Sequence, residues 1–235
     1  SIFIGGGTPS LFSAPALKQL IDGIRSRIAC VPDIEITLEA NPGTFEQEKF
    51  AAYRALGINR LSIGIHSFNS DPLQQLGRVH NGDEALRAVQ IAQHAGFSRI
   101  NLDLMHGLPG QSVAQALADL QQAIDLDPGH ISWYQLTIEP NTLYWNQPPQ
   151  LPEDDCLWDI QEAGQALLAQ QGYQQYEVSA YAKQDQQARH NLNYWQFGDF
   201  LGIGAGAHGK ISQADGRLER YWKTRQPDDY LCTEQ

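Results

Sequence analysis

Apolar residues follow two alternating patterns along the chain. Short apolar runs bounded by glycine, proline or asparagine are typical of buried strands, and apolar residues spaced three or four positions apart are typical of helices. The runs predict strands at 2–4, 34–40, 60–65, 100–105 and 131–138, and the longer spacing predicts helices at 14–28, 45–56, 83–95, 112–126 and 154–170. This alternation indicates parallel βαβ units and an α/β fold.

The pattern is less regular toward the end of the chain. Residues 175–180 and 200–203 compete for the place of a sixth strand, and residues 210–221 predict a hairpin that turns around Asp215 and Gly216. Periodicity leaves two α/β architectures open. One is an open, doubly wound sheet, and the other is a full or partial TIM-like barrel.

Polar residues gather where the predicted strands end, which is where βα proteins bind ligands. A polar side chain in a strand that is buried on both faces costs free energy unless it has a partner. Polar residues at five successive strand exits therefore indicate a ring of groups around one polar ligand. The members of this ring are Thr8, Ser10, Glu39, Asn41, His66, Ser67, Asn101, Asp103, His106, Gln135, Thr137 and Glu139.

Each member of this ring also has a structural explanation. The run Gly5–Gly7 lacks the remaining residues of a phosphate-binding loop, because Ser10 stands where G-x-G-x-x-G requires glycine. It fits a tight turn as well as a close approach of ligand to backbone. Glu39 fits a cap or a salt bridge equally well, whereas Asp103, flanked by two leucines, is harder to explain as a structural residue.

Composition narrows the class of protein. A net charge of −11 argues against a nucleic-acid partner, and no apolar run is long enough to span a bilayer. Cys30, Cys156 and Cys232 are far apart, so they predict free thiols in a reducing cytoplasm rather than a disulfide framework. The seven histidines include no H-x-x-x-H pair, which leaves a metal site without support.

Five motifs, taken in this order, resemble the oxygen-independent coproporphyrinogen III oxidase family. They are FIGGGTPS at 3–10, LEANPG at 38–43, NLDLMHGLP at 101–109, HNLNYW at 190–195 and GIGAGAHGK at 202–210. The resemblance implies radical S-adenosylmethionine (SAM) chemistry on a partial TIM-like (β/α)6 barrel. It implies a barrel over 1–208 and the start of an incomplete accessory region at 209–235.

The family's [4Fe–4S] cluster is held by a C-x-x-x-C-x-x-C loop after the first barrel strand, and the cluster chelates SAM. Ser1 opens directly onto an apolar strand, so we expect the chain to be a fragment that lacks that first strand and its loop. The three scattered cysteines are not substitutes. We therefore expect this chain to hold no metal and to be inactive by itself, and no catalytic residue is assigned.

The resemblance also implies which residues bind SAM. Gly6, Gly7 and Thr8 resemble the loop along its methionine moiety, Glu39 resembles a carboxylate that bonds to bound SAM, and Asp103 resembles its ribose or adenosine contact.

Four further positions complete the implied SAM site. Arg78 resembles the arginine that pairs with the SAM carboxylate, while Gln135 and His208 match positions close to SAM. His66 stands where the family usually has glutamine, and a histidine there would carry a charge that depends on pH.

The family has an oxidase branch and a heme-chaperone branch. Residues 39–42, 67–68 and 190–195 resemble the chaperone branch, which implies heme or porphyrin as ligand, a heme-acceptor protein as partner, and His190 and His208 as candidate iron ligands. Two alternatives stay open: an oxygen-independent coproporphyrinogen III oxidase and a SAM-binding module without radical chemistry. The apolar strand at 2–4, exposed at a sheet edge, would favour a dimer.

Overall fold

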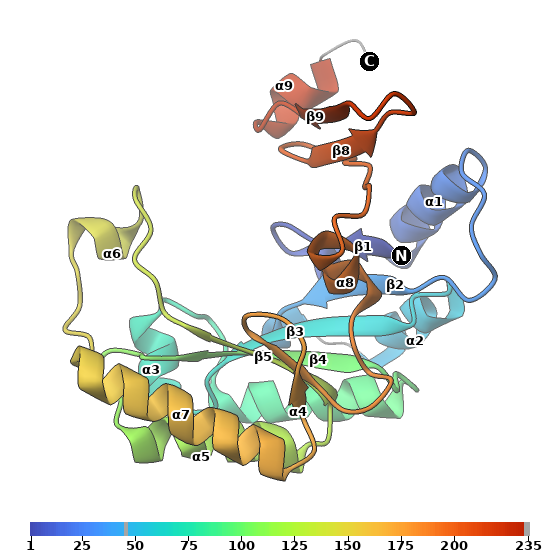
Figure 1. Ribbon diagram of the computed structural model, residues 1–235. Helices are drawn as coiled ribbons and strands as arrows, with labels where there is room; N and C mark the ends of the chain where they lie inside the picture. Colours follow the sequence, from blue (N-terminus) through green and yellow to red (C-terminus); the bar gives the residue numbers. More distant parts are fainter. Residues whose placement is uncertain (45–46, 233–235) are drawn as a thin grey trace. The chain divides into compact units, whose positions relative to one another are not determined.

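The computed structural model describes residues 1–44 and 47–232 (Figure 1). The chain divides into two compact units, Ser1–Gln187 and Ala188–Gln235, each described by itself below. This division falls earlier than the barrel boundary expected at residue 208. Within the described ranges, no helix is both long enough and apolar enough to cross a membrane.

The first unit is built on a seven-stranded sheet with the order β1-β2-β3-β4-β5-β7-β6. The strands from β1 to β5 run parallel, β7 is antiparallel to β5, and β6 is antiparallel to β7. Their bounds are β1 (Ile2–Ile4), β2 (Ile36–Ala40), β3 (Arg60–His66), β4 (Ile100–His106), β5 (Gly129–Gln135), β6 (Gln174–Gln175) and β7 (Ala180–Ala182). The predicted α/β class and its five parallel strands are confirmed.

The longer helices connect these strands as the apolar spacing predicts. They are α1 (Ala14–Arg25), α2 (Gln47–Ala55), α4 (Gly82–His94), α5 (Val113–Asp125) and α7 (Asp154–Gln170). Asn81 and Ser112 begin α4 and α5 with capping boxes, which satisfy backbone N–H groups at the helix start. The predicted start of α2 at residues 45–46 lies outside the described residues. The short helices α3 (Ser70–Gln75) and α6 (Leu143–Asn146) were not predicted.

The two faces of the parallel sheet differ in chemistry. Leu38, Ile63, Leu102 and Trp133 are buried on the face that α4, α5 and α7 cover (Figure 1). Alternate residues along the same strands point to the other face, because side chains in a strand alternate. That opposite face is polar, with Thr37, Glu39, Ser62, Asn101, Asp103, His130 and Ser132. The sheet therefore places a row of polar groups opposite the helix-covered core.

The sixth strand was predicted wrongly in extent and direction. Tyr176 N donates to Ala180 O, so residues 176–179 reverse the chain between the short strands β6 and β7. A reversal this tight makes the two strands antiparallel, whereas residues 175–180 were expected to continue the parallel sheet. Phe200, in the other candidate segment, forms only an isolated bridge with Lys210.

The second unit contains the predicted hairpin. Its elements are α8 (Arg189–Trp195), β8 (His208–Ser212), β9 (Leu218–Trp222) and α9 (Pro227–Cys232), with β8 and β9 antiparallel. The buried Lys210 Nζ lies 3.1 Å from Asp199 Oδ1 and donates to Phe197 O at 2.6 Å. These contacts join β8 to the segment that follows α8.

Candidate functional site

A cavity of about 230 Å³ opens at the carboxyl ends of strands β1 to β4. Parallel strands end at the same edge of a sheet, so residues far apart in sequence meet there. The cavity is lined by Gly7, Thr8, Pro9, Glu39, Ala40, Asn41, Ser62, Gly64, His66, Arg78 and Asp103. All of them belong to the first compact unit.

The glycine loop after β1 is held against β2. Gly6 N donates to Glu39 Oε2 at 3.0 Å, and both Gly6 and Gly7 have positive φ. A Cβ atom on Gly5 would lie 2.7 Å from the Phe3 ring and 2.9 Å from the Glu39 carboxylate, so a larger residue there would push these side chains away. Thr8 is joined to the next strand exit because Asn41 Nδ2 donates to Thr8 Oγ1 at 3.2 Å. The loop is thus preformed beside a carboxylate.

Asp103 carries the second carboxylate of the cavity. Ser62 Oγ donates to Asp103 Oδ2 and Asn101 Nδ2 donates to Asp103 Oδ1, both at 2.8 Å. Burial raises the pKa of Asp103 above its usual range, and the nearby Glu39 adds to that rise, while its hydrogen-bond donors lower it. Glu39 and Asp103 together offer acceptors to hydroxyl or ammonium groups of a ligand.

His66 differs from the expectation of a pH-dependent charge. Burial, followed by the positive charge of Arg78, lowers the pKa of His66 to about 3, so its imidazole is neutral at ordinary pH. Its backbone has φ 64°, and the β3–β4 register shifts between Gly64 and His66. Its buried Nδ1 has no hydrogen-bond partner in the described chain. His66 thus lines the cavity with a neutral ring, while its Nδ1 atom is a buried polar group without a partner among the described residues.

The loop that carries Arg78 is tied to the protein core. Ser67 Oγ donates to Asp119 Oδ2 at 2.5 Å, and Phe68 N donates to Asp119 Oδ1 at 2.9 Å. His80 Nε2 lies 3.0 Å from Ile65 O, just beyond Arg78. Sequence reasoning missed Asp119, although a lone aspartate on the apolar face of α5 is the signal that could have identified it.

The cavity brings together most of the predicted SAM residues. Six of them line it: Gly7, Thr8, Glu39, His66, Arg78 and Asp103. The backbone N–H of Gly6 donates a hydrogen bond to one of these, Glu39. Gln135 ends β5 and is not among the lining residues. His190 and His208 belong to the second compact unit. Ser62 and Gly64 line the cavity although their own sequence context did not single them out.

The described residues offer no set of metal ligands. Across residues 1–44 and 47–232, no group of three His, Cys, Asp or Glu side chains could hold a metal ion. Cys30, Cys156 and Cys232 are free thiols. The residues present therefore suit an organic, polar ligand rather than an iron–sulfur cluster.

The fold and the glycine-lined cavity define the class of protein. A sequence model of the Radical SAM superfamily matches residues 1–123, and the chain belongs to that superfamily. In general, the superfamily uses SAM together with a [4Fe–4S] cluster.

Individual relatives narrow the comparison. The chain is 58% identical over 231 residues to the heme chaperone HemW of Escherichia coli, covering 98% of this chain and 61% of that protein. It is 59% identical to the heme chaperone HemW of Haemophilus influenzae, with coverage of 98% and 60%. The chain thus spans about three fifths of the length of these curated relatives.

A solved structure has the same fold. Coproporphyrinogen III oxidase (HemN) from Escherichia coli, titled a radical SAM enzyme, superposes with a TM-score of 0.80. The match covers 95% of this chain and 54% of that one, at 24% identity. At this identity the likeness establishes the fold alone, and it supports the partial-barrel architecture.

Proposed function

We propose that this chain is the core of a radical SAM heme chaperone, which binds heme and transfers it to an acceptor protein. The observation that carries the proposal is the 58% identity to the heme chaperone HemW of Escherichia coli along 98% of the chain. Identity of this extent covers both compact units, so the proposal concerns the SAM cavity and the second unit together. We also propose the cytoplasm as its compartment, in keeping with three free thiols.

The cavity at β1 to β4 is the proposed SAM site. Arg78 suits the SAM carboxylate as a charged donor, while Glu39 and Asp103 are acceptors for its ammonium and ribose hydroxyl groups. The neutral imidazole of His66 lines the same cavity. In this superfamily the cluster and SAM supply one-electron chemistry. The residues of this chain bind and orient SAM, and the cluster ligands are not among those described.

The second unit is the proposed heme-binding part. His190 lies on α8 with its ring 4.9 Å from that of Tyr194, and His208 begins β8 with an exposed side chain. Either imidazole suits heme iron. Basic residues nearby could attract heme propionates. Lys210 and Arg217 are already paired with Asp199 and Asp215, so Arg220, Lys223 and Arg225 are the better candidates.

The proposal is tested by titrating the 235-residue chain with hemin and following the Soret absorbance. We expect saturable binding that the substitution His190→Ala or His208→Ala weakens about tenfold or more. The substitution His94→Ala is the control, because this exposed histidine only caps its own helix, with Nδ1 2.7 Å from Gln90 O. The fold of each variant is checked by circular dichroism.

Two other outcomes would replace this proposal. No saturable heme binding by this chain would favour the oxidase if a longer form of the protein that carries the C-x-x-x-C-x-x-C loop, reconstituted with its cluster and supplied with SAM and a reductant, forms protoporphyrinogen from coproporphyrinogen. Binding of S-adenosylhomocysteine without heme binding or decarboxylation would favour a SAM-binding module of another class.

A further inference from the structure

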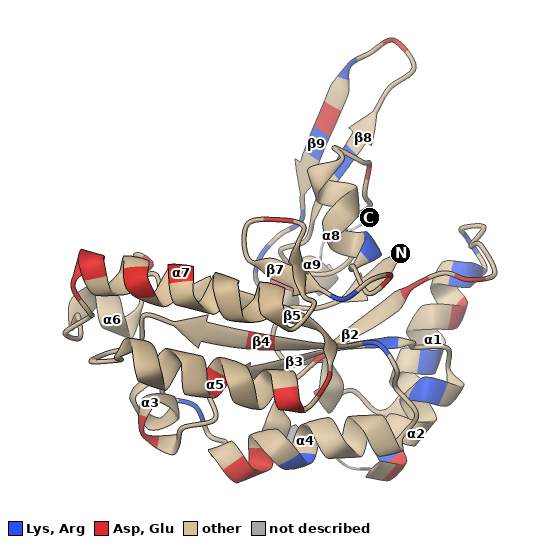
Figure 2. Cartoon of the chain, turned by 60° about the horizontal axis from the view of Figure 1, so that its bottom comes forward, with Lys and Arg blue, Asp and Glu red and all other residues tan. Residues whose placement is uncertain are grey.

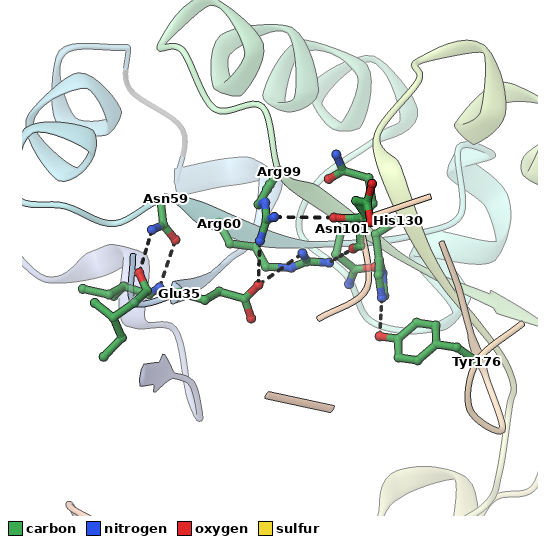
Figure 3. Close-up of polar contacts among 11 residues, drawn as sticks. Glu35, Asn59, Arg60, Arg99, Asn101, His130 and Tyr176 are labelled. Carbon is green, nitrogen blue, oxygen red and sulfur yellow. Dashed lines mark hydrogen bonds and ion pairs between the residues drawn. The ribbon is translucent and has the colours of Figure 1, made fainter. Parts of the chain in front are cut away.

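A line of buried polar side chains extends from the cavity along the polar face of the sheet. Asn101 lies on β4, in register with Ser62 of β3 and with His130 of β5. Asn101 Nδ2 donates to Asp103 Oδ1 at 2.8 Å, and Asn101 Oδ1 lies 2.6 Å from His130 Nδ1. His130 Nε2 lies 2.6 Å from the hydroxyl of Tyr176, in the turn between β6 and β7. Figure 3 shows His130 between Asn101 and Tyr176.

The chemistry of these groups gives the line one direction. When ionised, the Asp103 carboxylate only accepts hydrogen bonds, so the amide nitrogen of Asn101 must face it. The amide oxygen of Asn101 then accepts from His130 Nδ1–H. A neutral His130 consequently accepts at Nε2 from the Tyr176 hydroxyl. Hydrogen bonds that point the same way polarise one another, so each strengthens the donor that reaches Asp103.

The surroundings keep His130 neutral. Burial lowers the pKa of His130 well below its ordinary value, and the adjacent Arg60 lowers it further. Arg60 Nη1 lies 3.5 Å from Glu35 Oε2, and Arg99 Nη1 lies 3.2 Å from the same oxygen (Figure 3). This charged cluster lies beside the relay, the line of hydrogen bonds that runs from Tyr176 through His130 and Asn101 to Asp103. A further positive charge on His130 would therefore be unfavourable.

We propose that Asn101 and His130, anchored by the hydroxyl of Tyr176, are positioning residues that orient the Asp103 carboxylate toward the ligand in the cavity. The ligand part of this inference rests on the proposed SAM site. Asp103 is a half-buried wall of the cavity, whereas Asn101 and His130 are buried behind it and do not line it. They therefore act through Asp103 rather than by touching the ligand.

Other groups also act on the titration of Asp103. Glu39 of β2 acts on Asp103, Arg60 of β3 acts on His130, and the Tyr176 hydroxyl is hydrogen-bonded to His130. Tyr134 of β5 is a further titratable group nearby, and Asp103, Glu39 and Arg78 all act on it. The substitutions Asn101→Leu and His130→Leu leave all of these groups except His130 itself in place. A shift in those variants therefore reports on the donors that reach Asp103.

The first test needs no ligand. Carbon-13 NMR of the carboxyl groups follows the titration of Asp103 in the 235-residue chain. We expect Asn101→Leu and His130→Leu to raise its pKa by about one unit, because a charge-assisted donor is lost or weakened. The milder substitution Tyr176→Phe should raise the pKa of Asp103 less. The substitution His130→Gln keeps an amide donor, so it should raise this pKa less than His130→Leu does. Tyr173→Phe is the matched control, a neighbouring tyrosine outside the relay.

The second test measures binding of S-adenosylhomocysteine by calorimetry over a pH series. We expect about fivefold weaker binding in His130→Leu, and a loss of affinity toward acid that begins at higher pH than in the unmodified chain. An unchanged Asp103 titration in both His130→Leu and Tyr176→Phe would overturn the relay. Absence of binding by the unmodified chain, with the Asp103 shifts intact, would overturn the SAM site and leave the relay standing.

Discussion

Single residues decide the chemistry of the cavity through their partners. Glu39 is held by the Gly6 backbone, Asp103 is held by Ser62 and Asn101, and His66 keeps a buried nitrogen without a partner. The two carboxylates are acceptors and His66 is neutral, so Arg78 is the cation among the lining residues. This set fits a ligand that carries hydroxyl groups, an ammonium group and one carboxylate.

The carboxylates provide the test at this scale. Glu39→Ala and Asp103→Ala should each weaken binding of S-adenosylhomocysteine roughly tenfold or more, since losing a hydrogen bond to a charged group costs about 1.5–3 kcal/mol. Calorimetry on the folded variants measures the affinity. Glu139→Ala is the control, because Glu139 follows β5 and does not line the cavity. Equal affinity in all three variants would refute the assigned roles.

At the scale of secondary structure elements, buried charges join the amino ends of the central strands. Glu35 comes just before β2, Arg60 begins β3 and Arg99 comes just before β4. The Glu35 and Arg60 side chains are 1% and 2% exposed, whereas the surface pair Lys18–Asp22 is 62% and 58% exposed. The buried cluster therefore holds three strands in register at the end opposite the cavity.

Removing the buried carboxylate should destabilise the whole first unit. Glu35→Gln leaves Arg60 buried without its counter-charge, which typically costs about 3–5 kcal/mol. Urea unfolding followed by circular dichroism measures the change in the free energy of unfolding. The control Asp22→Asn breaks an exposed pair and should cost less than about 1 kcal/mol. Similar losses in the two variants would contradict the role of the cluster.

For the whole molecule, buried histidines set the response to acid. Burial lowers the pKa of His66 to about 3 and of His106 to about 4, and it places that of His130 well below 6.5. In the unfolded chain these histidines bind protons near pH 6.5, and in the folded chain they do not. The part of the folding stability that depends on their being neutral is therefore fully present above pH 6.5. It is lost as the pH falls toward 4, by up to about 1.4 kcal/mol per histidine per pH unit.

Thermal unfolding between pH 7.5 and 4.5 checks this expectation. The midpoint should fall steadily below pH 6.5, and His106→Gln should fall less steeply than the unmodified chain. The exposed His94→Gln serves as the control, with no change in slope. The raised pKa values of Asp103 and Asp119 act in the opposite direction, because their burial costs stability as the pH rises above their ordinary range. A flat profile down to pH 5 would contradict the histidine account.

The edge of the main sheet is a second whole-molecule feature. β1 is the outermost strand of the described sheet and pairs with β2. An apolar edge strand can pair with another chain, so we expect the sedimentation coefficient to rise with concentration. Ile2→Lys should suppress this association, because a charge at an edge opposes pairing. Val31→Lys, at an exposed apolar residue outside the strand, should not, and a strictly monomeric profile would contradict the expectation.

Charge is distributed unevenly over the molecule. Figure 2 shows acidic residues along α7 and basic residues along α1. The chain as a whole has a net charge of −11, and the cavity holds Glu39, Asp103 and Arg78. An anionic partner would therefore be attracted by local basic residues and not by the overall charge.

The sequence by itself determined the succession of the five parallel strands and their helices, and the end of the sheet at which the polar cavity lies. Apolar spacing reports directly on local structure, and the carboxyl ends of parallel strands meet wherever such a sheet forms. Glu39, His66 and Asp103 could therefore be assigned to one site before any geometry was known, whereas Arg78 was assigned to it only through the family resemblance. The resemblance to a family implied the class of ligand that these residues bind, which periodicity alone could not do.

Only the tertiary structure decided the hydrogen-bond partners and the protonation states of those residues. The antiparallel β7, the neutral state of His66 and the relay from Tyr176 to Asp103 depend on strand register and burial, which join residues distant in the chain. Asn101 and His130 are 29 positions apart in sequence and 2.6 Å apart across two strands. No local pattern encodes such a distance, because pairing between strands is fixed by the packing of the whole sheet.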